Sequence, residues 1–248
     1  MVDFKSLLKA GVHFGHKTSF GNPKMRPYIW GAKNRIHLID VSKTAVLLEY
    51  AGKKLKELAS EGKDILWVGT KKPAQGIIEK AGADLAMPSV VNRWIGGTLS
   101  NYGQVKKAIS RLLHLRDVLK KSTSYYTKKE LVMLQKQVNR LERNIGGIIE
   151  MSFPPAAVVV VDAKKEHSAV KEAYGMGIPV IALVDTNTDP SFINYLIPGN
   201  DDSPRSIKFV VEFLVACAAE GKKEADAKKT ALKKPEKTDK KAQTEPPK

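Results

Sequence analysis

Three short, continuous apolar runs stand out in the pattern of hydrophobic and polar positions along the chain. They are Ile65–Val68, Val158–Val161 and Val180–Val184, each rich in β-branched or large apolar side chains. Runs of this length without polar alternation are typical of strands buried on both faces of a parallel sheet. Each neighbours a helical pattern, including residues 45–59 and 166–174. Alternating strands and helices predict a doubly wound, mainly parallel α/β fold.

A different periodicity interrupts this pattern between residues 102 and 149. Spacings of three and four residues separate Leu131, Leu134, Val138, Leu141, Ile145 and Ile148, and Val105, Ile109, Leu112 and Leu119 form a matching seam if Arg116 takes a core-edge position. Thr127 and Glu130 have capping-box spacing at the start of the second helix. We therefore predict an inserted antiparallel coiled-coil hairpin, with helices about 30 Å long and a turn at residues 122–126. Two ordinary surface helices packed on the sheet are the alternative.

The predicted hairpin divides the α/β domain into two stretches, residues 1–101 and 150–220. Near the end of the second stretch, Ser203-Pro204 precedes apolar residues at helical spacing, which predicts a capped helix that closes the domain. From residue 221 the chain consists largely of Lys, Ala, Glu, Thr, Pro and Asp. Such a segment buries too little apolar surface to offset its ordering entropy. We therefore expect a disordered basic tail over residues 221–248.

The chain carries a large excess of positive charge, because 42 Lys and Arg residues against 26 Asp and Glu residues give a formal net charge of +16. Nucleic acid is favoured over a membrane surface as the counter-charge, since no strongly amphipathic basic helix stands out. A merely solubilising surface is the alternative. The single cysteine, Cys217, excludes an intramolecular disulfide, and no signal peptide or membrane-spanning apolar stretch occurs. We expect a cytoplasmic protein with no membrane partner.

Sequence signatures of catalysis are absent. No Walker loop, G-x-G-x-x-G turn or nucleophile elbow follows a predicted strand. The nearest approach is residues 68–73, where Lys71 and Lys72 follow a strand end and a glycine. These lysines can grip a phosphate at the next helix N-terminus, in a nucleotide or in a nucleic-acid backbone. We therefore expect a non-catalytic protein with no required cofactor and no small-molecule substrate. An α/β enzyme acting on nucleotides or RNA is the alternative.

Several carboxylates follow predicted strands or lie in turns near the end of the α/β domain. Asp162 and Asp185 fall at strand carboxyl ends, where α/β proteins place functional groups. The candidate metal ligands are His16, Asp189, Asp201 and Asp202, because carboxylates with an imidazole suit Mg²⁺ or Zn²⁺. Turn formation and helix capping also explain these aspartates, since Asp189-Pro190 and Asn200–Pro204 are turn sequences. A structural divalent cation is thus a hypothesis, because the spacing matches no known ligand motif.

Cations and aromatic residues are interspersed between residues 13 and 35. Cations hold phosphates, aromatic faces stack on bases, and the glycines and prolines here place polar groups on loops. Asn92–Thr98 is a second candidate, because its glycine pair lets an RNA backbone approach closely. Its Trp94 is either a stacking platform or a core anchor. The predicted RNA-binding residues are His13, His16, Lys17, Lys24, Arg26, Lys33, Arg35, Lys71, Lys72, Arg93, Trp94, Gly96, Gly97, Lys106, Lys107 and Arg111.

Six short motifs occur in the order and spacing of one known family. They are Ala10–His16, Asn22–Met25, Arg93–Thr98, Gly177–Val180, Asp185–Asn187 and Ile197–Asp202. Together they resemble the bacterial ribosomal protein S2 family over residues 6–221. Two positions depart from that family's usual pattern, since Phe20 stands where Trp is common and Ala156 stands where Asp is usual.

The resemblance implies an α/β domain with an inserted helical hairpin and a structural role in the small ribosomal subunit. It further implies binding of small-subunit rRNA near the junction of head and body, and contact with neighbouring ribosomal proteins. Support of late subunit assembly and docking of ribosomal protein S1 for translation initiation are implied as well. A free-standing RNA chaperone or regulator is the remaining alternative, and it would bind RNA without a stoichiometric place in a particle.

Overall fold

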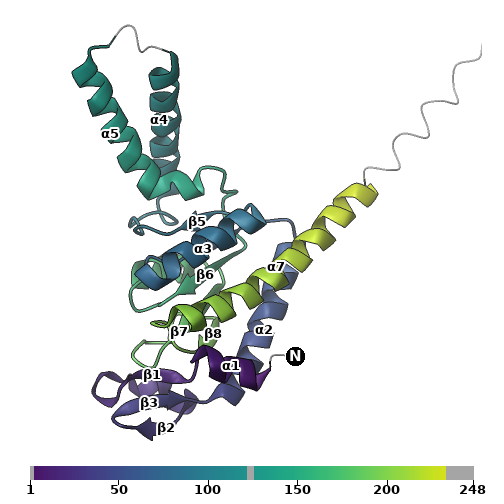
Figure 1. Cartoon of the computed structure of the whole chain (residues 1–248). Coiled ribbons are helices and arrows are strands. Elements are labelled where there is room, and N and C mark those ends of the chain that lie inside the picture. Colours follow the sequence, from purple (N-terminus) through teal and green to yellow (C-terminus); the bar gives the residue numbers. More distant parts are fainter. Residues whose placement is uncertain (1–2, 122–125, 233–248) are drawn as a thin grey trace, which may run out of the picture.

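The α/β body is built on a five-stranded parallel sheet (Figure 1). The computed structural model describes residues 3–121 and 126–232. Its strands are β4 (Ile65–Val68), β5 (Ser89–Val90), β6 (Ala157–Val161), β7 (Val180–Val184) and β8 (Tyr195–Pro198). Strands β4, β6 and β7 coincide with the three predicted apolar runs, and all neighbouring strands are parallel. The predicted α/β class is therefore confirmed.

The strand order β5-β4-β6-β7-β8 places a topological switch between β4 and β6. The chain leaves β4 for β5 on one side, and it returns to the other side of β4 at β6. Ligand-binding groups of doubly wound proteins gather at the carboxyl ends of the strands near such a switch. The loops that follow β4, β6, β7 and β8 all lie at this carboxyl edge, so the topology brings together residues far apart in sequence.

Apolar cores cover both faces of the sheet, because every residue of β4, β6 and β7 is buried and alternate side chains face opposite sides. Trp67 and Val159, which are aligned in neighbouring strands, pack on one face. That face is covered by α1 (Phe4–Ala10), α2 (Val41–Ser60), α3 (Lys72–Leu85) and α7 (Pro204–Leu232). Val68 and Val160 pack on the other face with α6 (His167–Gly175) and with the base of a helical hairpin.

Helices α4 (Tyr102–Lys121) and α5 (Lys128–Ile145) form this hairpin, which continues into a 3₁₀ turn, η3 (Gly146–Ile148), and projects from the body in Figure 1. The predicted capping box is present, with Thr127 N donating to Glu130 Oε2 at 2.9 Å and Glu130 N donating to Thr127 Oγ1 at 3.4 Å. The predicted seam residues are buried (Val138, Ile145, Ile148) or half-buried (Leu131, Leu134, Leu141). The supercoil of a coiled coil stays a prediction, and residues 122–125 of the predicted turn lie outside the described residues.

The last helix extends beyond the predicted end of the domain. We expected disorder from Gly221, but α7 continues to residue 232. A Cβ at Gly221 would collide with Lys56 O on α2, so the glycine lets the two helices pack in direct contact. Lys56 Nζ also pairs with Glu220 at 3.1 Å. The rest of the predicted tail, residues 233–248, lies outside the described residues. No helix among those described, α7 included, is long and apolar enough to cross a membrane.

The N-terminal segment forms a three-stranded antiparallel sheet, where we predicted loops. Its strands are β1 (Phe14–Lys17), β2 (Ile29–Lys33) and β3 (Ile36–Ile39), in the order β1-β3-β2, with 3₁₀ turns η1 (Thr18–Phe20) and η2 (Pro23–Tyr28) between the first two. Asn34 and Arg35 join β2 to β3, and their φ angles of 52° and 62° suit a two-residue hairpin turn. The glycines and prolines thus shape turns between short strands instead of preventing regular structure.

Candidate functional site

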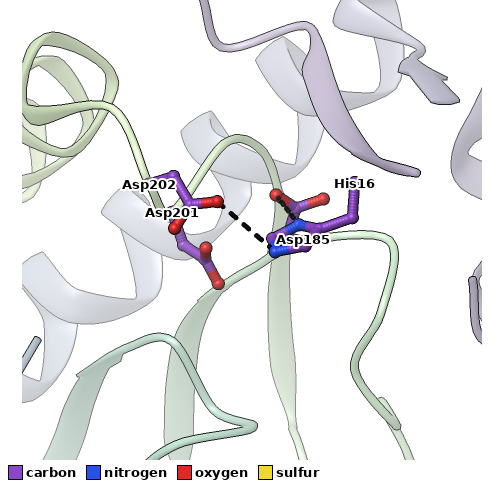
Figure 2. Close-up of side chains that lie close together, drawn as sticks. All are labelled: His16, Asp185, Asp201 and Asp202. Atoms are coloured by element: carbon purple, nitrogen blue, oxygen red, sulfur yellow. Dashed lines mark ion pairs between the residues drawn. The ribbon is translucent and has the colours of Figure 1, made fainter. Parts of the chain in front are cut away.

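Charged side chains converge at the carboxyl edge of the parallel sheet, where the N-terminal sheet joins it. Asp185 follows β7, and Asp201 and Asp202 follow β8. His16 comes from β1, which is held against the loop after β7 by a hydrogen bond from His16 N to Thr186 Oγ1 (3.1 Å). One ligand atom from each of His16, Asp185, Asp201 and Asp202 lies within 4.8 Å of the others (Figure 2). We call these four residues the carboxylate cluster.

Lys71, at the start of α3, neutralises one side of the carboxylate cluster. Its Nζ lies 2.6 Å from Asp201 Oδ1, 2.7 Å from Asp202 Oδ1 and 3.1 Å from Asp162 Oδ2. Burial lowers the pKa of Lys71, but the hydrogen bonds to Asp201 and Asp202 outweigh that effect and hold the pKa above its usual value. Three aspartates that follow later strands thus surround its ammonium group, and contact of Lys71 with RNA stays a prediction.

The imidazole of His16 lies on the other side of the cluster. Its Nδ1 is 2.8 Å from Asp185 Oδ2, and its Nε2 is 3.3 Å from Asp202 Oδ2. The contact with Asp185 raises the pKa of His16 and outweighs the opposing effect of burial. For Asp201, burial and the charge of Asp162 raise the pKa to about 7. Asp201 Oδ2 is buried and has no hydrogen-bond partner among the described residues. The carboxylates therefore outnumber the cations that face them.

Asp189, which we predicted as a metal ligand, lies outside the carboxylate cluster. Its carboxylate accepts hydrogen bonds from Ser191 Oγ at 2.6 Å and from Lys24 Nζ at 2.9 Å, and these bonds lower the pKa of Asp189 to about 2. Asp185 occupies the position that we assigned to Asp189, because it directly follows β7 and so lies at the sheet edge. Lys24, predicted to contact RNA, is thereby engaged in an ion pair, although its side chain is 56% exposed.

The N-terminal sheet presents cations and aromatic rings at its surface. The exposed cations of this segment that carry a prediction of RNA contact are Lys17, Lys24, Arg26, Lys33 and Arg35. Trp30 is 76% exposed and Phe20 is 63% exposed. His13 is half-buried with its ring 4.1 Å from that of Phe14, and burial lowers its pKa. The surface thus offers the expected combination of cations and aromatic faces, while His13 and His16 are drawn inward.

Glu172 of α6 holds the loop of residues 94–100, which contains the glycine pair, through hydrogen bonds. The position of Glu172 in the sequence gives no sign of this role. Glu172 Oε1 accepts from Trp94 Nε1 at 3.1 Å and from Gly97 N at 2.8 Å, while Oε2 accepts from Leu99 N at 3.0 Å and from Ser100 N at 3.2 Å. Trp94 is only 8% exposed, which favours the core anchor among the two roles considered for it.

The outer side of this loop and the base of the hairpin form a second basic surface. Arg93 and Gly96 are exposed, whereas Gly97 is half-buried. The predicted contacts on α4, namely Lys106, Lys107 and Arg111, are exposed, while Val105, Ile109 and Leu112 of the same helix are buried. Lys72 is exposed at the start of α3. The structure therefore places most of the predicted RNA-binding cations at the surface of the N-terminal sheet or near the base of the hairpin, whereas His16 and Lys71 are ion-paired in the carboxylate cluster.

Comparisons with known proteins agree with the order of motifs in the sequence. A family model described as ribosomal protein S2 matches residues 7–221. The small ribosomal subunit protein uS2 of Chloroherpeton thalassium is 44% identical over 236 residues, which cover 93% of this chain and 94% of that protein. The proteins of the same name from Nitratiruptor and Cytophaga hutchinsonii are also 44% identical, over 90% and 85% of this chain and 84% of each of those proteins. This chain therefore belongs to the ribosomal protein S2 family.

Proposed function

We propose that this chain binds small-subunit rRNA through its two exposed basic surfaces. By its family it is a structural component of the small ribosomal subunit, and that family is not one of enzymes. The observation that carries the rRNA proposal is the exposure of the predicted cations, which are Lys17, Arg26, Lys33 and Arg35 on the N-terminal sheet and Arg93, Lys106, Lys107 and Arg111 near the hairpin base. Exposed Lys and Arg side chains supply the phosphate contacts that dominate affinity for nucleic acid.

Salt dependence tests the rRNA proposal. In filter-binding titrations with small-subunit rRNA, affinity should fall by about a thousandfold between about 50 and 200 mM salt, because each neutralised phosphate releases counterions. The double variant Arg26→Ala/Arg35→Ala should bind more weakly and lower the salt slope by about 2. Lys53→Ala, which removes an exposed cation from α2, is the matched control and should bind as wild type does. An affinity that does not respond to salt would contradict the proposal.

A role in late subunit assembly belongs to the same proposal, since a chain bound by two separate surfaces can stabilise an rRNA arrangement only after both RNA parts are in place. Depletion of the protein should then leave small-subunit precursors that lack it, visible in sucrose gradients. Wild-type protein should co-sediment with complete small subunits at one copy each. A free-standing RNA chaperone would instead remain at the top of the gradient, which would contradict a stoichiometric role.

We further propose that the aromatic face of the N-terminal sheet docks ribosomal protein S1. Trp30 and Phe20 are large, exposed aromatic side chains, and such residues form the anchors of protein interfaces. Subunits containing Trp30→Ala should retain several-fold less ribosomal protein S1 on affinity purification. Phe153→Leu changes an exposed aromatic residue near the hairpin base and should have no effect. Equal retention in Trp30→Ala subunits would rule out this face.

We also propose a structural divalent cation at the carboxylate cluster, with zinc favoured because an imidazole accompanies the carboxylates. Two observations support this proposal. The four ligand atoms lie within 4.8 Å of one another, and Asp201 Oδ2 is buried without a hydrogen-bond partner among the described residues. His16, Asp185, Asp201 and Asp202 would hold the ion, while Lys71 would remain against Asp162.

Calorimetric titration of chelator-treated protein with Zn²⁺ tests the metal proposal. Wild-type protein should bind one equivalent and gain thermal stability, because the ion binds the folded state preferentially. His16→Ala and Asp185→Asn should lose both effects. Asp189→Asn is the matched control, since Asp189 lies outside the cluster and pairs with Lys24. Undiminished zinc binding in His16→Ala would show that the ion binds elsewhere and would contradict the proposal.

A further inference from the structure

A cavity of about 370 Å³ lies between α6 and the loop that follows β7. One side of the cavity is formed by the β6–α6 loop and α6, which contribute Lys164, His167 and Lys171. The other side is formed by the β7–β8 loop, which contributes Asn187, Thr188 and Phe192. This volume lies within the range of small-ligand sites. The cavity is built by loops at the carboxyl ends of β6 and β7, the edge at which α/β sheets bind ligands. No residue that the sequence marked for RNA contact lines it.

The aromatic wall of the cavity is Phe192, held at a defined angle. Its ring meets that of Tyr174 edge-on, with centroids 5.2 Å apart and an interplanar angle of 69°. Lys171 Nζ lies 5.9 Å from the centroid of the Phe192 ring. Phe192 nevertheless remains 36% exposed, so part of its surface is available to a ligand. A fixed, partly open aromatic ring beside a cation is the arrangement that stacks on an unpaired base.

The charge around the cavity favours an anion. Lys164, His167 and Lys171 are exposed at its rim, and α6 begins at His167, so the positive end of the helix dipole adds to their field. Asp189 is the one carboxylate among the lining residues, and Lys24 Nζ neutralises it at 2.9 Å. Glu172 of the same helix is hydrogen-bonded to the loop of residues 94–100. A phosphate at the rim would therefore meet uncompensated positive charge.

We propose that this cavity holds a single unpaired nucleotide of RNA, with its base against Phe192 and its phosphates beside Lys164 and Lys171. Asn22 and Asn187 also line the cavity, and amide side chains can form hydrogen bonds with a base edge. Paired bases are stacked inside a helix and do not reach such a pocket, so the ligand is a bulged or looped-out nucleotide. This inference rests on the proposed rRNA binding and assigns to it a third contact, distinct from the two basic surfaces.

A fluorescent base reports on the cavity directly. A short single-stranded oligoribonucleotide carries one 2-aminopurine, whose emission is quenched when it stacks on an aromatic ring. Wild-type full-length protein should quench it, and Phe192→Leu should weaken binding by about 5- to 100-fold, the usual range for loss of one base–aromatic stack. Lys164→Gln/Lys171→Gln should lower the salt slope by about 2. Phe153→Leu is the matched control, because Phe153 is exposed to a similar extent (38%) but stacks on Tyr102 away from the cavity.

Further arms separate the possible outcomes. Adenosine monophosphate should bind at least about tenfold more weakly than the oligonucleotide, because it lacks flanking phosphates; equal affinity would overturn RNA as the occupant. In one outcome, Arg26→Ala/Arg35→Ala weakens rRNA binding, whereas Phe192→Leu binds rRNA and quenches 2-aminopurine as wild type does. This outcome would overturn the proposal of a nucleotide in the cavity and leave the rRNA proposal standing. Absence of salt-sensitive rRNA binding by wild type would instead overturn the rRNA proposal. Melting temperatures of Phe192→Leu and Phe153→Leu within a few degrees of wild type exclude misfolding as the cause.

Discussion

Glu172 and Asp201 are two buried or half-buried carboxylates in a basic protein, and their surroundings act in opposite directions. Burial raises the pKa of Glu172, but hydrogen bonds from Gly97, Trp94, Leu99 and Ser100 outweigh it and leave the pKa below its usual value. Burial and the charge of Asp162 raise the pKa of Asp201 to about 7, although Lys71 donates to it. A carboxylate that accepts several N–H hydrogen bonds holds a loop in place, whereas one that lies among other carboxylates is suited to take up a proton or a cation.

The largest loss of stability that this comparison predicts follows substitution of Lys71, the cation that neutralises the aspartates around Asp201. Lys71→Met leaves Asp162, Asp201 and Asp202 without their shared ammonium, and breaking a largely buried ion pair in this way costs about 3–5 kcal/mol. The free energy of unfolding should be measured by urea denaturation in the presence of chelator. The double variant Lys71→Met/Asp201→Asn should recover part of the loss, because one uncompensated charge is removed. A single variant as stable as wild type would mean that the carboxylates do not need the lysine.

At Glu172 we expect a somewhat smaller loss. Glu172→Gln replaces one acceptor oxygen by an NH₂ group that faces N–H donors, so hydrogen bonds from the 94–100 loop are lost together with the charge. Removing such charge-assisted bonds costs about 2–4 kcal/mol. Glu79→Gln is the control, since Glu79 is exposed on α3, and it should change stability by less than about 0.5 kcal/mol. If the two variants had the same melting temperature, the hydrogen bonds of Glu172 would not be what holds this loop in place.

The backbone of the same loop provides a third test. Gly97 has a φ of +89°, and a Cβ there would lie 3.3 Å from Asn101 Cβ, so Gly97→Ala should cost about 1–2 kcal/mol. Gly96 is its matched control, because a Cβ at that position meets no atom within 4 Å and Gly96→Ala should be nearly neutral. Thermal unfolding of both variants distinguishes them. Equal melting temperatures would show that the conformation around Gly97 is easily exchanged for another.

The sheet was predictable from sequence where burial leaves a continuous signal. Val158–Val161 and Val180–Val184 are apolar throughout because both faces are covered, and their positions coincide with the observed strands. Strand β5 is two residues long and β8 ends in a proline, so neither carries a pattern that stands out from a loop. The extension of α7 was missed because the segment has few large apolar residues, whereas Gly221 provides contact with α2 without a large side chain.

The site was predictable only in part, because contacts between distant residues decide it. His16, Asp201 and Asp202 were chosen for their ligand chemistry and do meet, since β1 is held against the loop after β7. Asp185 lies in the cluster and Asp189 does not, because a turn sequence does not reveal which aspartate directly follows the strand. Glu172 left no trace in the sequence, because an acidic residue on a helix usually faces solvent, and its partners lie more than 70 residues away.

The smallest expected effect is at Asp189, an exposed carboxylate that adds a third case to the comparison. Ser191 and Lys24 lower its pKa to about 2, so its contribution to stability is present above the unfolded value near 4 and is lost as the pH falls towards 2. Because the side chains of Asp189 and Lys24 are 47% and 56% exposed, solvent screening keeps this contribution below about 1 kcal/mol. Unfolding of wild type and Asp189→Asn should therefore differ slightly at pH 7, less in high salt, and progressively less as the pH falls through 2. A difference in the free energy of unfolding that grew on acidification would require a raised pKa for Asp189. Asp189 would then resemble Asp201, whose pKa is raised by its surroundings.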